Sequence, residues 1–486
     1  MRALALVPMV AACASAPVAE TRVGPGLQSD EPAANAAFSE DPRQLRFAPL
    51  EFDPPRAKVH GASGDGLKAF HLHDPELPLL HLALILGVGS KDDPTDRPGV
   101  AELLERVLPV GGAGDRPPAA FADAAESRAI DVRVSVAADH TQIRVSSLSK
   151  DADLAFELLA DLVMRPLYEK ERLEIERGRS IEGVRRRNDH PHAIASRAFR
   201  EALYGPASPW ARIPTQADIG AITREDLIAL HRRFFTAGNA RLVVVGDLDE
   251  AGLGERLSTW FGSWTGAAPA RAAVDRSGRP DGPTRRLAVK KGLGQAVVLL
   301  GQRFLPRHHP DRYAADLLNY LLGGGVFQSR LGEAIRSDKG LAYSVSSGVR
   351  RLGDDDGYLY VFAGTKPQSQ AEVMKLAGDV VERMHRSADV TEEELARAKD
   401  AFLNRHIFHF ETAYRVAFKQ ALLDHYGYDP NWLRTYPERI AKVTVGDIAR
   451  VARERLTPDR FATILVTPTS PAGDGWETID LEAAVR

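Results

Sequence analysis

The chain has 486 residues, of which 63 are basic and 66 acidic, and its formal net charge is −3. A balance so close to neutral gives no electrostatic footprint for nucleic acid. The length exceeds what one hydrophobic core usually supports, so several domains are expected. No apolar run approaches the roughly 18 residues that a membrane-spanning helix needs.

The N-terminus predicts a lipid-anchored protein. An apolar stretch from Ala3 to Ala12 is followed by Cys13, the only cysteine in the sequence. The segment Val10-Ala11-Ala12-Cys13 resembles a bacterial lipobox, in which the thiol is diacylated and the chain is cut before it. We expect a lipoprotein-type signal peptide at residues 1–13 and a flexible tether at 14–52. A shorter ordinary signal peptide or a misplaced start codon is the alternative.

The residue after Cys13 bears on the membrane to which the lipid would anchor the chain. Ala14 gives no inner-membrane retention signal of the aspartate type, so we expect the periplasmic face of the bacterial outer membrane. The chain would then meet the membrane through its N-terminal lipid only. After removal of the signal peptide and acylation of Cys13, no thiol is left for disulfides in that oxidising compartment.

The first half contains two helices with acidic residues at defined positions. A buried-looking strand from Leu79 to Val88 precedes a helix at Val100–Leu108, where Glu102 and Arg106 stand four residues apart and share one face. These two residues could form a plain surface ion pair, worth about 0.2–0.5 kcal/mol to the helix. A later helix carries Glu182 and ends in the basic run Arg185-Arg186-Arg187, for which a solvated helix end is favoured over a phosphate site.

An internal repeat divides the chain into two halves. The segment Thr223–Ala229 aligns without gaps on Thr444–Arg450, and each begins with a Thr-x-x-Asp capping pattern. At the same spacing, each helix leads into a strand, Leu242–Asp247 and Thr463–Pro468. The repeat predicts an α+β fold of two homologous halves, each packing a sheet on helices.

Composition sets the expected domain boundaries. Residues 265–285 are rich in Gly, Ala, Pro and Arg, with little to bury, and read as a linker. The expected domains are therefore 53–264 and 286–475, followed by a tail at 476–486.

The second half contains a glycine-rich turn followed by a helix and a strand. The sequence from Leu321 to Val345 begins with Gly323-Gly324-Gly325, continues as a helix to about Arg336 that Gly340 stops, and enters a strand near Ala342. Arg336 could simply lie favourably at a helix C-terminus, and Tyr343 could be half-buried in a strand.

Together these segments resemble the insulinase-like (pitrilysin-type, M16) zinc metallopeptidases over about residues 55 to 470. In that family the first helix carries His-x-x-Glu-His, and the third zinc ligand is a Glu on the second helix. Here Glu102 and Arg106 stand at the two histidine positions, Glu105 matches the general-base position, and Glu182 matches the third ligand. The resemblance also implies two α/β-roll halves that form a half-chamber.

The resemblance gives a role to Arg336 and Tyr343 as well. In active relatives an Arg–Tyr pair in this segment grips the substrate backbone and helps to stabilise the oxyanion. In two-subunit bacterial members, one chain carries the zinc helix and the other carries the Arg–Tyr pair. This chain resembles the second kind, which implies substrate binding by Arg336 and Tyr343 and a heterodimeric partner that supplies zinc and the base.

No metal is assigned to this chain. Arginine has no lone pair and stays cationic, so Arg106 would repel zinc while pairing with Glu102, Glu105 or Glu182. It also argues against a three-carboxylate calcium or magnesium site. The remaining histidine pairs lack a recognisable completing ligand and are favoured as solvated or core residues: His190 and His192, His308 and His309, and His406 and His409.

Three functions follow as hypotheses. The first is a catalytically incomplete peptidase subunit that binds unstructured peptides and completes the active site of a His-x-x-Glu-His partner. The second is a peptide-binding or scaffold envelope lipoprotein without a role in proteolysis, like the peptidase-derived core subunits of respiratory complexes. The third, the least favoured, is an autonomous peptidase with unusual ligands.

Overall fold

The computed structural model describes residues 55–61, 66–271, 274–325, 329–353, 355–471 and 475–485. The predicted signal peptide, Cys13 and the tether at 14–52 lie outside these ranges. Among the described helices, none is both long and apolar enough to cross a membrane. Residues from Pro54 onward form one compact unit, which contains both halves of the repeat.

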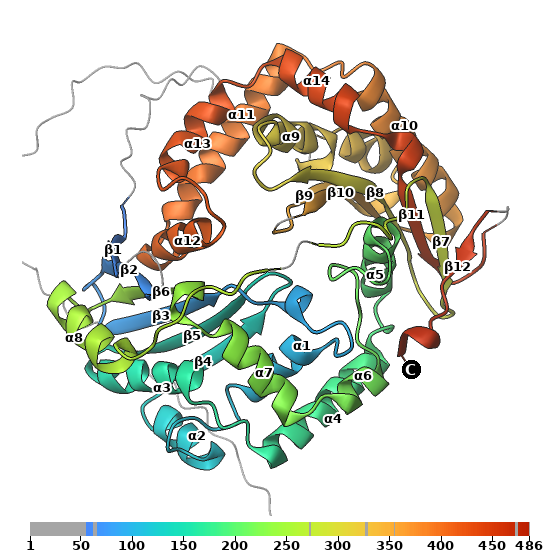
Figure 1. The fold of residues 1–486 in the computed structure, drawn as a ribbon. Helices are drawn as coiled ribbons and strands as arrows, with labels where there is room; N and C mark the ends of the chain where they lie inside the picture. The colour runs from blue at the N-terminus through green and yellow to red at the C-terminus, as the bar shows by residue number, and fades with distance from the viewer. Residues whose placement is uncertain are drawn as a thin grey trace, which may run out of the picture. The chain divides into compact units, whose positions relative to one another are not determined.

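The first half contains a sheet and the helices of its own segment (Figure 1). In chain order its elements are β1 (Lys58–His60), β2 (Lys68–His73), β3 (Leu79–Leu86), α1 (Val100–Val107), α2 (Pro118–Glu126), β4 (Asp131–Val136), β5 (Thr141–Leu148), α3 (Ala152–Met164), α4 (Lys170–Arg186), α5 (Pro191–Tyr204), α6 (Gln216–Ala221), α7 (Arg224–Phe234), β6 (Ala240–Gly246) and α8 (Glu250–Phe261).

The second half follows a similar order, but it opens with two strands instead of three, ends in a strand instead of a helix, and contains two π-helical segments, η5 and η6. Its elements are β7 (Thr284–Val289), β8 (Ala296–Pro306), α9 (Arg312–Asn319), η5 (Tyr320–Gly324), η6 (Gly332–Ser337), β9 (Ala342–Arg350), β10 (Asp356–Thr365), α10 (Gln370–Arg386), α11 (Glu392–His406), α12 (Ala413–His425), α13 (Trp432–Ala441), α14 (Val445–Arg455), β11 (Ala462–Thr467) and β12 (Glu477–Thr478).

The strand orders confirm the internal repeat. In the described residues, one six-stranded sheet has the order β1-β2-β6-β3-β5-β4 and the other β12-β7-β11-β8-β10-β9. In both sheets the strand that follows the capped helix pairs parallel to one neighbour and antiparallel to the other: β6 with β2 and β3, β11 with β7 and β8. The expected α+β class with two homologous halves is therefore confirmed.

The capping pattern identified in the repeat forms in both halves. Thr223 and Thr444 each accept a hydrogen bond from the N–H of an aspartate three residues on, Asp226 and Asp447. Each aspartate in turn accepts from the threonine N–H, at 2.7 and 2.9 Å. These reciprocal bonds satisfy N–H groups that have no partner within the helix, so they fix where α7 and α14 begin.

The two halves exchange one helix each. Helix α5, from the first half, packs on β8 and β11 of the second sheet, and α12, from the second half, packs on β6, β2 and β3 of the first sheet (Figure 1). A buried apolar cluster lies at each contact: Ile194, Phe199, Leu299 and Ile464 belong to one, and Ile85, Val243 and Ala417 to the other. Each half has a core of its own and also shares these two buried clusters with the other half.

The expected tail at 476–486 is part of the fold. Strand β12 pairs parallel to β7, and the Leu481 carbonyl accepts a 2.7 Å hydrogen bond from Asn188 of the first half. The residues read as a linker are also held in place, since the side chains of Arg276 and Arg279 form ion pairs with the buried Asp355. Composition alone missed these bonds because it does not reveal the partner of a polar residue in a distant segment.

Candidate functional site

The first candidate site lies on α1, whose apolar side packs into the core of the first half. Leu103, Leu104 and Val107 are buried, whereas Glu102 and Arg106 are exposed on the opposite face. The helix start is held by Asp93, whose carboxylate accepts hydrogen bonds from the N–H groups of Gly99 and Ala101 at 2.7 and 2.8 Å. Burial raises the pKa of Asp93 to about 6 despite these donors.

Glu105, at the general-base position, is half-buried and bound to backbone. Its carboxylate hydrogen-bonds the Val136 backbone at the end of β4. Burial raises the pKa of Glu105, the Val136 bond and Arg106 oppose that rise, and Glu102 adds to it. The side chain therefore ties α1 to the last strand of the first sheet.

Glu182 lies on α4, which packs against α1. Its exposed carboxylate pairs within its own helix, with Arg186 at 2.8 Å and Arg185 at 3.6 Å. The expected ion pair of Arg106 does not form: in the described part of the chain, the Arg106 guanidinium makes no hydrogen bond or ion pair. Arg185 and Arg186, three and four residues further along α4, pair with Glu182 instead.

Positive charge also gathers near Glu102. Arg187, which follows α4, is partly buried, and burial lowers its pKa while Glu102 and Asp218 oppose that change. Arg106 and Arg187 thus place positive charge near the carboxylates of α1. Arg185 and Arg186 of the basic run that ends α4 form ion pairs with Glu182. This pairing favours a solvated helix end over a phosphate site.

These residues do not suit a zinc ion. Tetrahedral zinc takes neutral imidazole, thiolate or carboxylate donors, and a guanidinium offers none. Glu182 is already paired with two arginines, and Glu105 is bound to backbone. Within the described ranges, no three His, Cys, Asp or Glu side chains gather as a metal site would require. We therefore assign no reaction step to a metal ion bound by this chain.

The second candidate site, Arg336 and Tyr343, lies where the backbone is irregular at both residues. Arg336 belongs to η6, a π-helical segment, and its carbonyl accepts a 3.1 Å hydrogen bond from the Gly340 N–H. In β9, Ala342 pairs with Thr365 and Ser344 with Gly364, so Tyr343 is the extra residue of a β-bulge. Its side chain is 69% exposed. Both irregularities are enriched at functional sites, because each redirects a side chain.

Close packing holds η5 and η6 against β9. A Cβ on Gly323 would lie 2.6 Å from the Ser347 N and 2.7 Å from Leu331 Cδ1, so only glycine fits there. The Ser347 hydroxyl donates to the Asn319 side chain at 2.8 Å. The glycine-rich turn is thus required for close backbone approach, which explains its composition in chemical terms.

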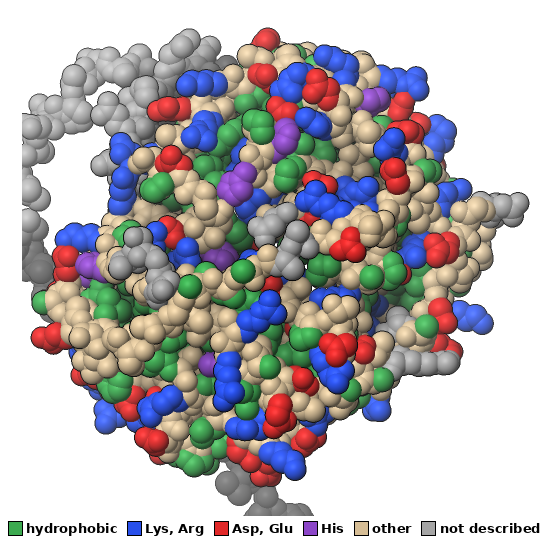
Figure 2. All heavy atoms as spheres, in the orientation of Figure 1, with side chains coloured by type: hydrophobic (Ala, Val, Ile, Leu, Met, Phe, Trp, Pro, Cys, Tyr) green, Lys and Arg blue, Asp and Glu red, His purple; other side chains and the backbone are tan. Residues whose placement is uncertain are grey.

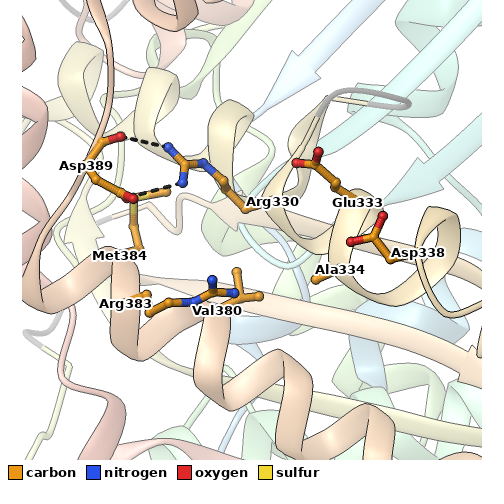
Figure 3. Close-up of a pocket in the computed structure, with 8 residues that line it drawn as sticks. All are labelled: Arg330, Glu333, Ala334, Asp338, Val380, Arg383, Met384 and Asp389. Carbon is orange, nitrogen blue, oxygen red and sulfur yellow. Dashed lines mark hydrogen bonds and ion pairs between the residues drawn. The ribbon is translucent and has the colours of Figure 1, made fainter.

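A pocket of about 210 Å³ lies on the same segment without including Arg336 or Tyr343 (Figure 3). Arg330, two residues before η6, donates hydrogen bonds to the carboxylate and the carbonyl of Asp389, at 3.2 and 3.0 Å. Glu333 and Asp338 lie on the opposite side of the pocket (Figure 3). We read these contacts as an anchor that fixes the segment against the loop before α11.

The two candidate sites belong to different cores. Leu103 and Val184 of α1 and α4 pack in the first half's cluster, whereas Ile335 and Ala342, next to Arg336 and Tyr343, pack in the second half's. The face in Figure 2 shows basic and acidic side chains interspersed. Sequence reasoning missed the role of Asp93, the π-helical turn and the bulge. Only the turn Lys91-Asp92-Asp93 and the glycine run gave any signal of them.

Comparison with known proteins agrees with this architecture. Residues 70–207 match the family described as Insulinase (Peptidase family M16), and residues 221–402 match the one described as Peptidase M16 inactive domain. An uncharacterized zinc protease of Mycobacterium tuberculosis is 31% identical over 401 residues, which cover 80% of this chain and 89% of that protein. The zinc protease PqqE of Helicobacter pylori is 24% identical over 396 residues, covering 80% and 88%.

Solved structures show the same fold. A crystal structure described as a peptidase M16 inactive domain, from Pseudomonas fluorescens, superposes with a TM-score of 0.74 at 25% identity, covering 86% of this chain and all of that one. The periplasmic protease PqqL of Escherichia coli gives a TM-score of 0.70 at 18% identity and covers 90% of this chain but 49% of its own. By sequence and by fold, this chain belongs to the M16 (insulinase) peptidase family.

Proposed function

We propose that this chain is a catalytically incomplete subunit of an M16-type zinc metallopeptidase. It binds unstructured peptide and presents Arg336 and Tyr343 to a substrate held on a second M16-type subunit. That partner carries an intact His-x-x-Glu-His, the zinc ion and the general base.

One contrast carries the proposal. The open face of α1 holds Glu102 and Arg106 where zinc donors would be needed. Tyr343, in contrast, stands exposed at a bulge in β9, and Arg336 lies in the π-helical η6, which packs against β9. Both Arg and Tyr donate hydrogen bonds, and an arginine adds the charge that a developing oxyanion rewards. A protein that only served as a scaffold would have no chemical use for this pair.

The first experiment identifies the partner by affinity pull-down of this chain from its native envelope. A stoichiometric M16-type protein with His-x-x-Glu-His supports the proposal. Recovery of the chain alone, or with unrelated envelope proteins, favours the peptide-binding or scaffold function. Stoichiometric zinc in the purified chain, lost on Glu182→Ala, would instead revive an autonomous peptidase.

Reconstitution then tests the role of Tyr343. With the partner and an unstructured peptide, Tyr343→Phe is expected to lower kcat by about 10²-fold, the usual effect of losing one oxyanion donor. The matched control is Tyr320→Phe, because Tyr320 packs edge-on against Phe402 and lies outside the proposed pair. Unchanged turnover in Tyr343→Phe would contradict the proposal.

We also propose that the chain is held at the periplasmic face of the outer membrane by a lipid on Cys13. The lipobox-like sequence is the support, and it lies outside the described residues. Metabolic labelling with a radioactive fatty acid is expected to mark the full-length chain and to fail for Cys13→Ala. A labelled Cys13→Ala protein would exclude this anchor.

A further inference from the structure

A small pocket lined by Arg350 lies where α5 packs on the second sheet. Its volume is about 160 Å³, and its lining comes from both halves: Ser196 and Phe199 from α5, Arg350 from β9, and Tyr358 and Tyr360 from β10. A cavity of roughly 150 Å³ holds a benzene molecule, so this one has room for one peptide side chain or chain end.

The pocket has an aromatic floor. The rings of Phe199 and Tyr358 meet edge to face at 5.7 Å, and Tyr358 and Tyr360 lie 6.1 Å apart. A Cβ on Gly348 would lie 2.6 Å from the Tyr360 ring and hydroxyl, so the glycine lets that ring lie across β9. The floor is thus built by close backbone approach rather than left over from loose packing.

The charge around this floor is of one sign. Arg350 pairs across the strands with Tyr358, and both Arg350 and Arg200 of α5 act on the pKa of the Tyr358 hydroxyl, lowering it against the larger effect of burial. In the described residues, neither guanidinium forms a hydrogen bond or an ion pair. No acidic side chain is among the residues that line the pocket.

A third arginine shows how concentrated this charge is. Burial, together with the charges of the neighbouring Arg187 and Arg200, lowers the pKa of Arg197 to about 10. The like charges of Arg200 on α5 and Arg350 on β9 favour an anion, and a planar guanidinium suits a carboxylate in particular.

The pocket and Tyr343 lie at opposite ends of one strand. β9 runs from Ala342 to Arg350 and is the last strand in the order of its sheet. A strand rises about 3.3 Å per residue, so Tyr343 and Arg350 are roughly 23 Å apart. A peptide extended along β9 from Tyr343 would reach the pocket after about seven residues.

We propose that this pocket binds a peptide carboxylate next to an apolar or aromatic side chain and so selects substrates several residues away from the scissile bond. The claim that the ligand is a peptide rests on the proposed function. Arg350 holds the carboxylate, the positive charge of Arg200 near Tyr358 adds to the attraction, and the rings of Phe199, Tyr358 and Tyr360 hold the adjoining side chain. The carboxylate comes from the C-terminus of the peptide or from an internal Asp or Glu.

The test measures binding to the chain alone by fluorescence anisotropy, without partner or turnover. The first pair of probes is a ten-residue unstructured peptide ending in Phe, as free acid and as amide. The second pair is amidated and carries an internal Glu or Gln beside the Phe. If the chain terminus is the ligand, the acid binds at least about tenfold more tightly than the amide; if a side chain is the ligand, Glu exceeds Gln likewise.

The dependence on Arg350 decides the outcome. Arg350→Gln is expected to abolish the preference for the carboxylate in whichever pair shows it, while binding of the amide or Gln peptide stays the same. Arg453→Gln, an exposed arginine on α14, serves as the matched control and should leave the preference intact. No carboxylate preference in either pair, or one that survives Arg350→Gln, overturns the proposal.

The result is separable from the fate of the proposed function. If the chain prefers the carboxylate peptide through Arg350 but recovers no M16-type partner, the pocket proposal holds and the proposed subunit function fails. If hydrolysis with the partner depends on Tyr343 but Arg350→Gln has no effect on peptide binding, the proposed subunit function holds and the pocket proposal fails.

Discussion

At the residue scale, two side chains separate the α1–α4 site from a zinc site. By the resemblance, Glu105 and Glu182 match the family's base and third-ligand positions, and their helices, α1 and α4, pack together. We therefore expect Glu102→His combined with Arg106→His to create a site that binds zinc. Two imidazoles four residues apart on one helix, plus the Glu182 carboxylate, form a three-ligand set. Zinc content after dialysis, measured by mass spectrometry, should approach one ion per chain.

The matched control adds Glu182→Ala to the double variant, which should lose most of the gained zinc. Two features of this structure would weaken the affinity: the ion pairs of Glu182 with Arg185 and Arg186, and the nearby Arg187. If the double variant gains no zinc, or keeps it without Glu182, the assignment of these positions is wrong.

A buried histidine gives a pH dependence at the same scale. His231 is 8% exposed, lies 4.2 Å from the Phe235 ring, and burial lowers its pKa to about 4. The unfolded chain, with an ordinary pKa near 6.5, binds the proton first. The neutral ring therefore stabilises the fold above pH 6.5, and this contribution is lost as pH falls from about 6.5 to 4.

At pH 5 the loss amounts to roughly 2 kcal/mol in the free energy of unfolding. The thermal midpoint should fall between pH 7.5 and pH 5 by more in the native sequence than in His231→Phe, which has nothing to titrate at that position. Leu77→Ala, at an exposed apolar residue with nothing to titrate, is the control and should keep the full native pH dependence. Equal slopes in all three proteins would contradict the prediction.

At the element scale, the glycine-rich turn positions Arg336 and Tyr343 through its contact with β9. Gly323→Ala is expected to destabilise the protein by about 1–3 kcal/mol, because the added methyl overlaps Ser347 and Leu331. It should also weaken peptide binding. The control is Gly378→Ala in α10, where a Cβ meets nothing within 4 Å, and it should be neutral or stabilising by up to about 1 kcal/mol. Thermal midpoints of both variants, measured side by side, check this order.

The same elements show how far the sequence could be read. Capped helices and the strands after them were predictable, because Thr-x-x-Asp satisfies helix N–H groups locally and apolar periodicity is local too. The π-helical turn around Arg336 was not, since its apolar spacing resembles that of an ordinary helix. The bulge at Tyr343 was hidden as well, because a bulge is defined by the register of the partner strand, Gly364 and Thr365.

At the scale of the whole molecule, the exchange of α5 and α12 was beyond sequence reasoning. The repeat predicts two sheets, but the sequence of an amphipathic helix does not reveal which sheet its apolar face will cover. Polar contacts reinforce each exchange. The Tyr204 hydroxyl donates to the Asp356 carbonyl at 2.9 Å, and Arg241 of β6 pairs with Asp424 of α12 at 2.9 Å. The expected linker therefore joins halves that are already held together by their cores.

Asp139 adds a charged contact between the halves. Its carboxylate accepts from Arg307 at 3.2 Å and from the Tyr426 hydroxyl at 3.1 Å, and the Arg307 guanidinium lies 3.5 Å from the Tyr426 ring centre. Although burial opposes it, the bonds with His140, Arg307 and Tyr426 leave the pKa of Asp139 below its ordinary value. The contact is thus charged at neutral pH and weakens only in acid.

This sharing of cores predicts that neither half folds well alone. Residues 55–271 expressed by themselves would expose the apolar face of α5, with Ile194 and Phe199, and leave the sheet residues Ile85 and Val243 uncovered. Exposed apolar patches of this kind drive aggregation. We expect the fragment to aggregate or to lack a cooperative unfolding transition. When co-expressed with residues 274–486, it should co-elute with them as a stable one-to-one complex.

The control keeps every contact and breaks only the chain. A protease site placed at residues 272–273 of the intact protein, once cut, should leave both pieces together in size-exclusion chromatography with nearly the original thermal midpoint, because α5 and α12 still lie on their sheets. A soluble, monomeric first half with a cooperative transition of its own would show that the exchanged helices are dispensable, and the shared-core description of the molecule would fail.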